Sequence, residues 1–120
     1  MSLKLIATTG VGLDGNIIDI GGGTSKLAGL LVVQGHKKVT VLDIASRSIE
    51  EARLTLGEQS NKIKWIEADV TNYNFAEEYD LWHDRAVFHF LTDSHDRERY
   101  VDSVQQSLKA GGHLIIATFG

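Results

Sequence analysis

Short runs of aliphatic and β-branched residues alternate along the chain with segments in which apolar residues recur every three or four positions. The short runs predict buried strands, and the spaced pattern predicts helices with one apolar face. Glycine separates many of these segments, and the sequence contains no proline. The expected strands occupy residues 16–20, 39–42, 63–68, 79–83 and 114–119.

Helices are expected between these strands. Leucines spaced by three and four residues predict the first helix, over 25–34. Ser48 and Glu51 have the spacing of a capping box and indicate the start of a second helix. A last helix is predicted over 94–109, and residues 88–91 are expected to lie in a loop before it.

Strands joined by single helices form right-handed βαβ units, which build a parallel sheet with helices on both faces. The sequence therefore predicts an α/β fold, a doubly wound Rossmann-like three-layer sandwich with a mainly parallel sheet of about five strands. Residues 1–120 are expected to form a single domain, because this length is typical of one domain. A ligand site is expected at the carboxyl ends of the strands, beside the first strand.

The segment before the first strand allows two interpretations. Residues 5–10 match residues 115–120 at four of six positions. So short a match arises easily by chance. Both segments nevertheless have a strand-like composition, so a sixth strand at the N-terminus is the alternative interpretation.

Composition narrows the classes of partner. Lys and Arg total 12 against 16 Asp and Glu, a formal charge of −4, and the cations are scattered among acids. Such a chain repels phosphate backbones and anionic lipids, so neither nucleic acid nor membrane is expected as a partner. The absence of cysteine excludes disulfides and thiolate chemistry. The same absence fits a reducing cytoplasm, which is the expected location. A soluble domain is expected, because the N-terminus lacks a signal-peptide segment and no apolar run is long enough to span a membrane.

Three glycines, Gly21 to Gly23, follow the first strand directly and precede a helix. Glycine lets the backbone turn sharply and lets a ligand pack against it, as in nucleotide-binding loops, although a tight turn without a ligand is the alternative. Asp43 ends the second strand about 20 residues later, where an acid accepts hydrogen bonds from a ribose or caps the next helix. Asp69 repeats this position after the third strand, so Asp19, Asp43 and Asp69 are expected on one acidic rim.

The loop lacks the features of two common nucleotide sites. A dinucleotide site expects a third glycine at position 26, where Lys26 stands, and a phosphate loop expects a Gly-Lys-Ser/Thr order that is absent. An acidic rim also repels a pyrophosphate. It suits a ligand that carries a ribose, an amino group and a positive charge.

Asp19, Gly21, Gly23 and Ser25 match the first motif of class I S-adenosylmethionine-dependent methyltransferases, and residues 17–118 resemble the core of that family. The resemblance implies methyl transfer from S-adenosylmethionine to a small-molecule or protein side-chain acceptor, with S-adenosylhomocysteine as product. It also implies that the motif residues bind the methionine part of this cofactor.

The resemblance assigns further cofactor contacts to the ends of the next two strands. Asp43 would hold the ribose and Ile44 would pack on the adenine. Asp69 and Val70 would contact the adenine amine and ring. Residues 81–91 are similar to a bacterial subgroup of small methyltransferases.

A sulfonium is already an activated methyl donor, so the protein is expected mainly to align the acceptor. The fourth strand ends at His83, Asp84 and Arg85, beside the expected position of the methyl group. His83 could act as a base, Asp84 could bind or deprotonate an acceptor amine, and Arg85 could hold a carboxylate. Alternatively, Asp84 and Arg85 form a structural ion pair and His83 packs in the sheet. No metal is expected, because the spacing matches no familiar ligand pattern.

In that family the sheet normally has seven strands, the last two forming an antiparallel hairpin, and this hairpin is not expected here. The apolar edge over 114–119 therefore predicts a homo-oligomer, in the simplest case a dimer, formed through the fifth strand. That strand is expected to be covered by the N-terminal strand of the same chain or by that of a neighbour. Three functions stay open: a methyltransferase, a cofactor-binding or structural domain without turnover, and an NAD-dependent oxidoreductase. Lys26 argues against the third.

Overall fold

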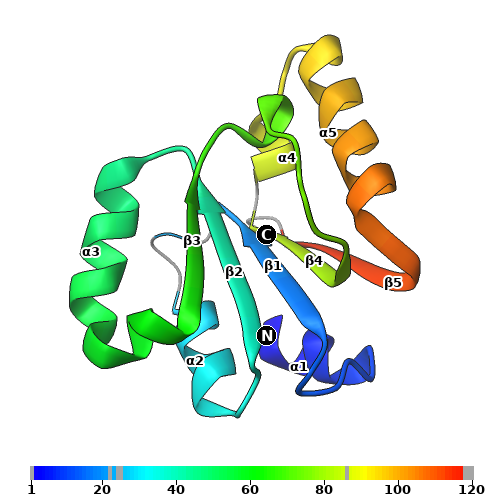
Figure 1. The fold of residues 1–120 in the computed structure, drawn as a ribbon. Coiled ribbons are helices and arrows are strands. Elements are labelled where there is room, and N and C mark those ends of the chain that lie inside the picture. The colour runs from blue at the N-terminus through cyan, green and yellow to red at the C-terminus, as the bar shows by residue number, and fades with distance from the viewer. Residues whose placement is uncertain (1, 22, 24–25, 86, 118–120) are drawn as a thin grey trace.

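The computed structural model describes residues 2–21, 23, 26–85 and 87–117. In this part of the chain, five strands form one parallel sheet in the order β3-β2-β1-β4-β5, which confirms the expected Rossmann-like sandwich (Figure 1). The strands are β1 (Asn16–Ile20), β2 (Lys38–Asp43), β3 (Ile63–Glu67), β4 (Tyr79–Arg85) and β5 (Leu108–Ala117). The helices are α1 (Ser2–Thr8), α2 (Leu27–Val33), α3 (Ser46–Leu56), α4 (Val87–Phe90), α5 (Ser94–Ser107) and the 3-10 helices η1 (Gly57–Lys62) and η2 (Val70–Asn72).

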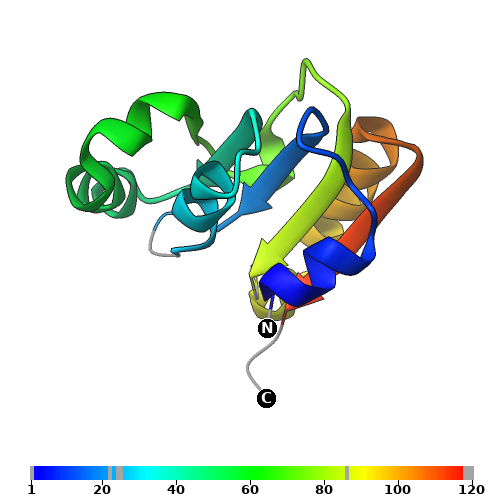
Figure 2. The same cartoon turned by 90° about the horizontal axis from the view of Figure 1, so that it is seen from below.

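Helices cover both faces of the sheet, as the alternation of strands and helices requires. On one face, α1 and α2 enclose a core that contains Ile17 and Leu31. On the other face, α5 and η2 enclose a second core that contains Ile18, Trp82 and Tyr100. Figure 2 shows α5 on the far side of the sheet from α1 and α2.

β1 occupies the centre of the sheet, between β2 and β4. The chain adds β2 and β3 on one side of β1 and then crosses to the other side to add β4 and β5. The order of the strands therefore reverses beside β1. Doubly wound folds bind their ligands at the carboxyl ends of the strands at such a point, where the glycine loop and the end of β2 meet.

The N-terminal segment forms α1, so its interpretation as a sixth strand is wrong. Ile6 is buried in the first core and Leu3 packs against the same core, a spacing of three residues that suits a helix. The hydroxyls of Thr8 and Thr9 donate to backbone carbonyls three residues earlier. The match between residues 5–10 and 115–120 does not decide the conformation. A segment forms a helix where every third or fourth side chain is buried, whatever strand it resembles in composition.

Several element boundaries near the site also differ from the expected ones. β4 continues through Arg85, two residues beyond its expected end, and α4 follows where a loop was expected. α3 begins at Ser46, so Ser48 lies inside the helix and does not cap it. α5 ends at Ser107 and β5 begins at Leu108, earlier than the expected start at residue 114. Pairing with β4 extends β5 across Gly111 and Gly112, where the sequence suggests a turn.

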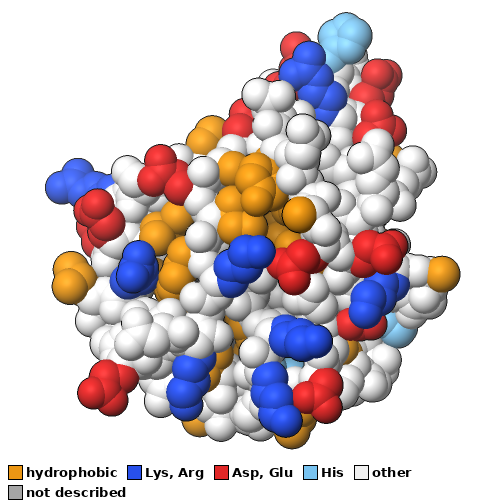
Figure 3. Space-filling view, viewed as in Figure 1, with side chains coloured by type: hydrophobic (Ala, Val, Ile, Leu, Met, Phe, Trp, Pro, Cys, Tyr) orange, Lys and Arg blue, Asp and Glu red, His pale blue; other side chains and the backbone are white. Residues whose placement is uncertain are grey.

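The face shown in Figure 3 carries acidic and basic side chains interspersed with each other. Ion pairs join Lys37 to Asp14 at 3.3 Å and Lys64 to Glu77 at 2.8 Å. Within the described ranges, the helices are all too short or too polar to cross a bilayer.

Candidate functional site

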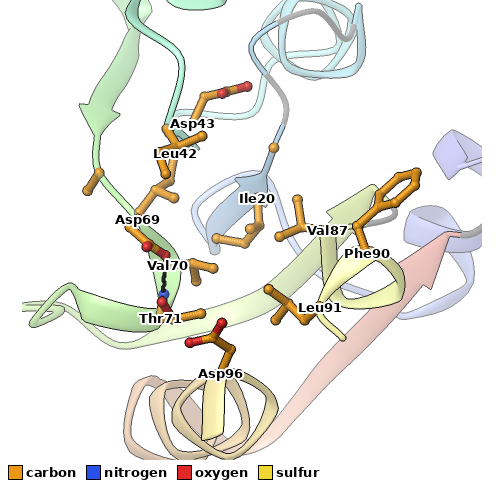
Figure 4. A pocket seen from close by; sticks show the side chains of 13 residues that line it. Ile20, Leu42, Asp43, Asp69, Val70, Thr71, Val87, Phe90, Leu91 and Asp96 are labelled. Carbon is orange, nitrogen blue, oxygen red and sulfur yellow. Dashed lines mark hydrogen bonds between the residues drawn. The ribbon is translucent and has the colours of Figure 1, made fainter. Parts of the chain in front are cut away.

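A pocket of about 300 Å³ opens at the carboxyl edge of the sheet, between the ends of the central strands and the α4–α5 region (Figure 4). Its walls are mostly aliphatic, with a few carboxylates among them. Of the described residues that the resemblance assigns to the cofactor, the pocket wall includes Gly21, Asp43, Ile44, Asp69 and Val70. Asp19 and Gly23 lie in the chain next to this wall, and Ser25 lies outside the described residues.

Asp43, the last residue of β2, joins the glycine loop to the second strand. Its Oδ2 accepts the backbone amide of Gly23 at 3.0 Å, and its Oδ1 accepts the amide of Ala45 at 2.9 Å. A Cβ at position 23 would approach Asp43 Oδ2 to 2.7 Å, so this contact requires glycine. Each carboxylate oxygen accepts more than one hydrogen bond, so Asp43 keeps capacity for the hydroxyls of a ligand.

Gly21 turns the chain away from β1 at the pocket. Its φ of +73° lies in the left-handed region, and its amide donates to the Leu42 carbonyl at 2.7 Å. A Cβ at this position would collide with the side chain of Val87 in α4. Glycine therefore allows the loop, the end of β2 and α4 to converge at one place.

Asp69 follows β3 and caps the short helix η2. Its Oδ1 accepts both the Thr71 amide at 2.9 Å and the Thr71 hydroxyl at 2.7 Å. These bonds fix the carboxylate at the pocket wall and use one oxygen. The geometry leaves the other oxygen suited to accept a hydrogen bond from an amino group of a ligand.

The apolar wall opposite the strand ends comes from α4 and the residue after it. Val87, Phe90 and Leu91 line the pocket (Figure 4). The sequence expectations place this segment in a loop and assign it no binding role. Apolar residues at positions 87, 90 and 91 have helical spacing, which is the signal that identifies this face.

Asp96, in the first turn of α5, also lines the pocket and is directed into it (Figure 4). Asp93 caps the same helix by accepting the amide of His95 at 2.7 Å. An acid in a first helical turn is ordinarily explained by the helix dipole, so the sequence gives Asp96 no site role. Together with Asp43 and Asp69, it makes three carboxylates among the described lining residues.

Asp19 does not lie on the acidic rim with Asp43 and Asp69, where the sequence predicts it. Successive side chains of β1 point to opposite faces of the sheet, so Asp19 lies on the other face from Ile18 and Ile20. It forms a buried pair with His83, whose Nδ1 lies 2.8 Å from Asp19 Oδ1. Burial raises the pKa of the Asp19 carboxyl, and the hydrogen bond with His83 opposes this effect. Asp19 Oδ2 is buried and has no hydrogen-bond partner among the described residues.

Asp84 is fully buried and bonded on both oxygens. Its carboxylate accepts the backbone amides of Val87 at 2.6 Å and Phe88 at 2.9 Å, so it organises the start of α4. It also accepts the Tyr100 hydroxyl, which in turn accepts the indole N–H of Trp82 at 3.0 Å. Burial, with a further contribution from Asp84, raises the pKa of Tyr100 well above its ordinary range, so the phenol stays a donor.

Arg85 is the exposed member of the three residues that end β4. Asp84 and Arg85 form no ion pair in the described structure, because the Asp84 carboxylate is occupied by backbone amides and Tyr100. Among the described residues, no three histidine or acidic side chains lie close enough together to hold a metal ion.

The arrangement has a defined chemical preference. An aliphatic slot between the strand ends and α4 suits a flat apolar group. Carboxylates at its edges accept hydrogen bonds from hydroxyls and amino groups and attract positive charge. The glycine loop allows close approach of a ligand to the backbone. The pocket is therefore suited to a cationic nucleoside and not to a polyphosphate.

Comparison with known proteins agrees with this geometry. The model of a family described as methyltransferase domain matches residues 17–112. Malonyl-[acyl-carrier protein] O-methyltransferase 1 of Ilyobacter polytropus is 31% identical over 106 residues, which make up 88% of this chain and 38% of that protein. The chain thus spans about two fifths of the length of this curated relative.

Two solved structures have the same fold. The N-methyltransferase NodS from Bradyrhizobium japonicum, in complex with S-adenosylhomocysteine, has a TM-score of 0.79 at 25% identity, over 96% of this chain and 58% of that one. The glycopeptide N-methyltransferase MtfA, also with S-adenosylhomocysteine, has a TM-score of 0.81 at 18% identity, over 96% and 50%. The second likeness concerns the fold alone.

Proposed function

The chain belongs to the methyltransferase domain family, and on this premise we propose that it binds S-adenosylmethionine and transfers the cofactor's methyl group to an acceptor. The observation that carries the proposal is the contact between Gly23 and Asp43 beside the pocket. This one hydrogen bond brings the glycine loop and the acidic end of β2 together, which is the combination that an adenosyl ligand with a positive charge requires.

The residues of the pocket fit the nucleoside part of such a cofactor. In the proposed assignment Asp43 holds the ribose hydroxyls, which its two carboxylate oxygens still have capacity to accept. Ile44 and Val70 pack on the adenine, and Asp69 accepts a hydrogen bond from the adenine amine. The aliphatic walls supply the apolar surface that a purine needs.

The glycine loop and Asp19 fit the methionine part. Gly21 and Gly23 keep the backbone free of side chains where the ligand approaches. Within the described ranges, Asp19 carries a buried oxygen without a hydrogen-bond partner, which an ammonium group would satisfy. Ser25 belongs to the same proposed contact set by its motif position.

Bound S-adenosylmethionine supplies a methyl group on a positively charged sulfur, already activated for transfer. The chain's own contribution is to orient the acceptor and exclude water. Of the three residues expected to be catalytic, Arg85 remains the proposed contact with the acceptor, and His83 and Asp84 are proposed to act by positioning. Exposure of Arg85 supports a role in holding an anionic acceptor, and the buried contacts of His83 and Asp84 support roles in positioning the glycine loop and α4.

The proposed acceptor is a small molecule or a protein side chain. The relative from Ilyobacter polytropus is named for a malonyl-acyl-carrier-protein acceptor, and this supports an acyl or carboxylate group as one class to test. The negative net charge supports the absence of nucleic acid and membrane as partners. A cytoplasmic location and a single domain over 1–120 are proposed on the cysteine-free composition and the length.

A homo-oligomer formed through β5 is part of the proposal. β5 lies at the edge of the sheet, and Leu114 and Ile116 on it are 45% and 39% exposed. Edge strands with exposed apolar residues pair with other chains. A dimer of this chain would cover these side chains.

A cofactor-binding domain without turnover is the second candidate. One observation favours it: both His83 and Asp84 form buried hydrogen bonds with other groups of the protein. Neither side chain is then free to take a proton from an acceptor without rearrangement. An NAD-dependent oxidoreductase stays the less favoured alternative, because Lys26 occupies the third glycine position.

Calorimetric titration with S-adenosylmethionine, S-adenosylhomocysteine and NAD tests the proposal. Binding of both adenosyl compounds but not NAD is expected. Binding of NAD alone would support the oxidoreductase, and binding of none would contradict any cofactor role. A methyl-transfer screen over amine, hydroxyl and carboxylate acceptors then separates the enzyme from the binding domain, since only the enzyme forms S-adenosylhomocysteine.

A further inference from the structure

Asp19 and His83 form a buried acid–imidazole pair directly behind the glycine loop. The two residues are register partners across β1 and β4, and their side chains are 0% and 1% exposed. His83 Nδ1 lies 2.8 Å from Asp19 Oδ1. A hydrogen bond between a carboxylate and an imidazole is strengthened when either group is charged.

The other oxygen of the Asp19 carboxylate is unsatisfied within the described part of the chain. Asp19 Oδ2 is buried and has no hydrogen-bond partner among these residues. Leaving a buried acceptor without a partner costs free energy, so such an atom calls for a functional explanation. The next two residues of the chain, Ile20 and Gly21, line the pocket. The unsatisfied oxygen therefore belongs to a residue at the entrance of the glycine loop.

The charged groups around Asp19 are few. Among the described residues, His83 and Arg85 attract its negative charge and Asp84 repels it. Its register partner on the other side, Val41 of β2, is apolar. Burial raises the pKa of the Asp19 carboxyl, and its hydrogen bond with His83 acts against this. A positive charge placed beside Asp19 would favour the ionised form of its carboxyl.

We propose that His83 is a positioning residue, and that its pairing with Asp19 couples binding of the cofactor's ammonium group to release of one proton. The inference rests on the proposed function. In the free protein the pair shares a proton and has no net charge, which suits its burial. When the ammonium approaches Asp19, that proton leaves the pair and passes to the solvent. Asp19 then stays ionised between His83 and the ligand.

Calorimetry with S-adenosylhomocysteine measures this proton directly. Titrations are run in buffers of different ionisation enthalpy between about pH 5.5 and 7.5, where an amino-acid ammonium stays protonated. The observed enthalpy is expected to vary with the buffer and to give release of up to one proton per ligand. The affinity is expected to rise with pH, by up to tenfold per unit, until the pair has lost its proton.

Two variants separate proton coupling from a purely structural role. His83→Asn retains an amide donor near the position of Nδ1 but cannot titrate, so it is expected to bind without proton release. The matched control is His113→Gln, which removes an exposed histidine of β5 and should leave proton release unchanged.

Each outcome decides the inference. Proton release by the wild type and the control but not by His83→Asn supports it. Equal enthalpies in all buffers, with binding intact, overturn it and leave the proposed function standing. Full release by a folded His83→Asn also overturns it. Absence of any binding by the wild type overturns both proposals. If His83→Asn does not fold, the buffer series and pH profile of the wild type decide alone.

Discussion

The backbone amide of Gly23 donates to Asp43 Oδ2 over 3.0 Å and holds the glycine loop against the end of β2. The same carboxylate accepts the amide of Ala45, so it also orders the chain that enters α3. One side chain thereby connects two strand ends and a helix at the edge of the pocket. Each oxygen of this carboxylate can accept a further hydrogen bond. The group that holds the glycine loop in place can therefore also bind a ligand.

Asp43→Asn is expected to weaken binding of S-adenosylhomocysteine by tenfold or more. The amide lacks the charge and one of the two acceptor oxygens, and hydrogen bonds to charged groups are worth about 1.5–3 kcal/mol. Calorimetric titration measures the loss, and thermal unfolding checks that the fold persists. Asp14→Asn is the control, since Asp14 lies in an exposed ion pair with Lys37. Equal affinities for the two variants would contradict a ligand role for Asp43.

Gly21→Ala is expected to lower both stability and cofactor affinity. The φ of +73° strains any residue with a Cβ, and this Cβ would collide with Val87. The comparison is Gly57→Ala, where φ is +60° and no atom lies within 4 Å of the added Cβ. That control should lose about 1–3 kcal/mol of stability from backbone strain but keep its affinity. Partial recovery in the Gly21→Ala/Val87→Ala double variant would identify the collision as the cause.

Tyr100→Phe and Asp84→Asn are both expected to reduce methyl transfer. Tyr100→Phe leaves the indole N–H of Trp82 and one oxygen of Asp84 without the phenol, at a cost of about 1–3 kcal/mol in the free energy of unfolding. If Asp84 acts by positioning α4, loss of either partner disturbs the same pocket wall. Turnover assays and chemical unfolding measure the two effects. Normal turnover in Tyr100→Phe with an inactive Asp84→Asn would instead assign Asp84 a direct role on the acceptor.

Asp80→Asn is expected to flatten the loss of stability in acid. The backbone amide of Asn16, followed by the interaction with Lys109, holds the pKa of the Asp80 carboxyl below its ordinary value. A carboxyl with a lowered pKa in the folded protein stabilises the fold above the unfolded value of 3.8, and this contribution disappears as pH falls through the folded value. Unfolding free energies measured from pH 5 downward should decline less steeply in the variant. An unchanged slope would contradict this role.

Ile116→Lys is expected to convert a dimer into a monomer, because a lysine on an exposed edge strand opposes pairing with a second chain. Sedimentation velocity at micromolar concentration measures the change. Leu54→Lys is the matched control, since Leu54 is 83% exposed on α3, away from β5. A wild-type protein that sediments as a monomer would contradict association through β5.

Much of the fold follows from local patterning. The alternation of aliphatic runs with helical spacing was sufficient to predict a parallel sheet, and the strand-end position of Asp43 was sufficient to place it beside the glycine loop. These features depend on residues that are near one another in the chain. The same local patterning could not decide the N-terminal segment, where burial of Ile6 against the sheet selects a helix.

Pairings between distant residues were decided by the tertiary structure. Asp19 and His83 are 64 residues apart, and they meet only because β1 and β4 pair in one particular register. Asp84 has a strand-end position in the sequence, but the packing of α5 brings Tyr100 to it and buries it. Periodicity along a chain determines which residues share a face. It does not determine which strand lies alongside, and the partner strand sets the charge, burial and hydrogen bonding of each acid.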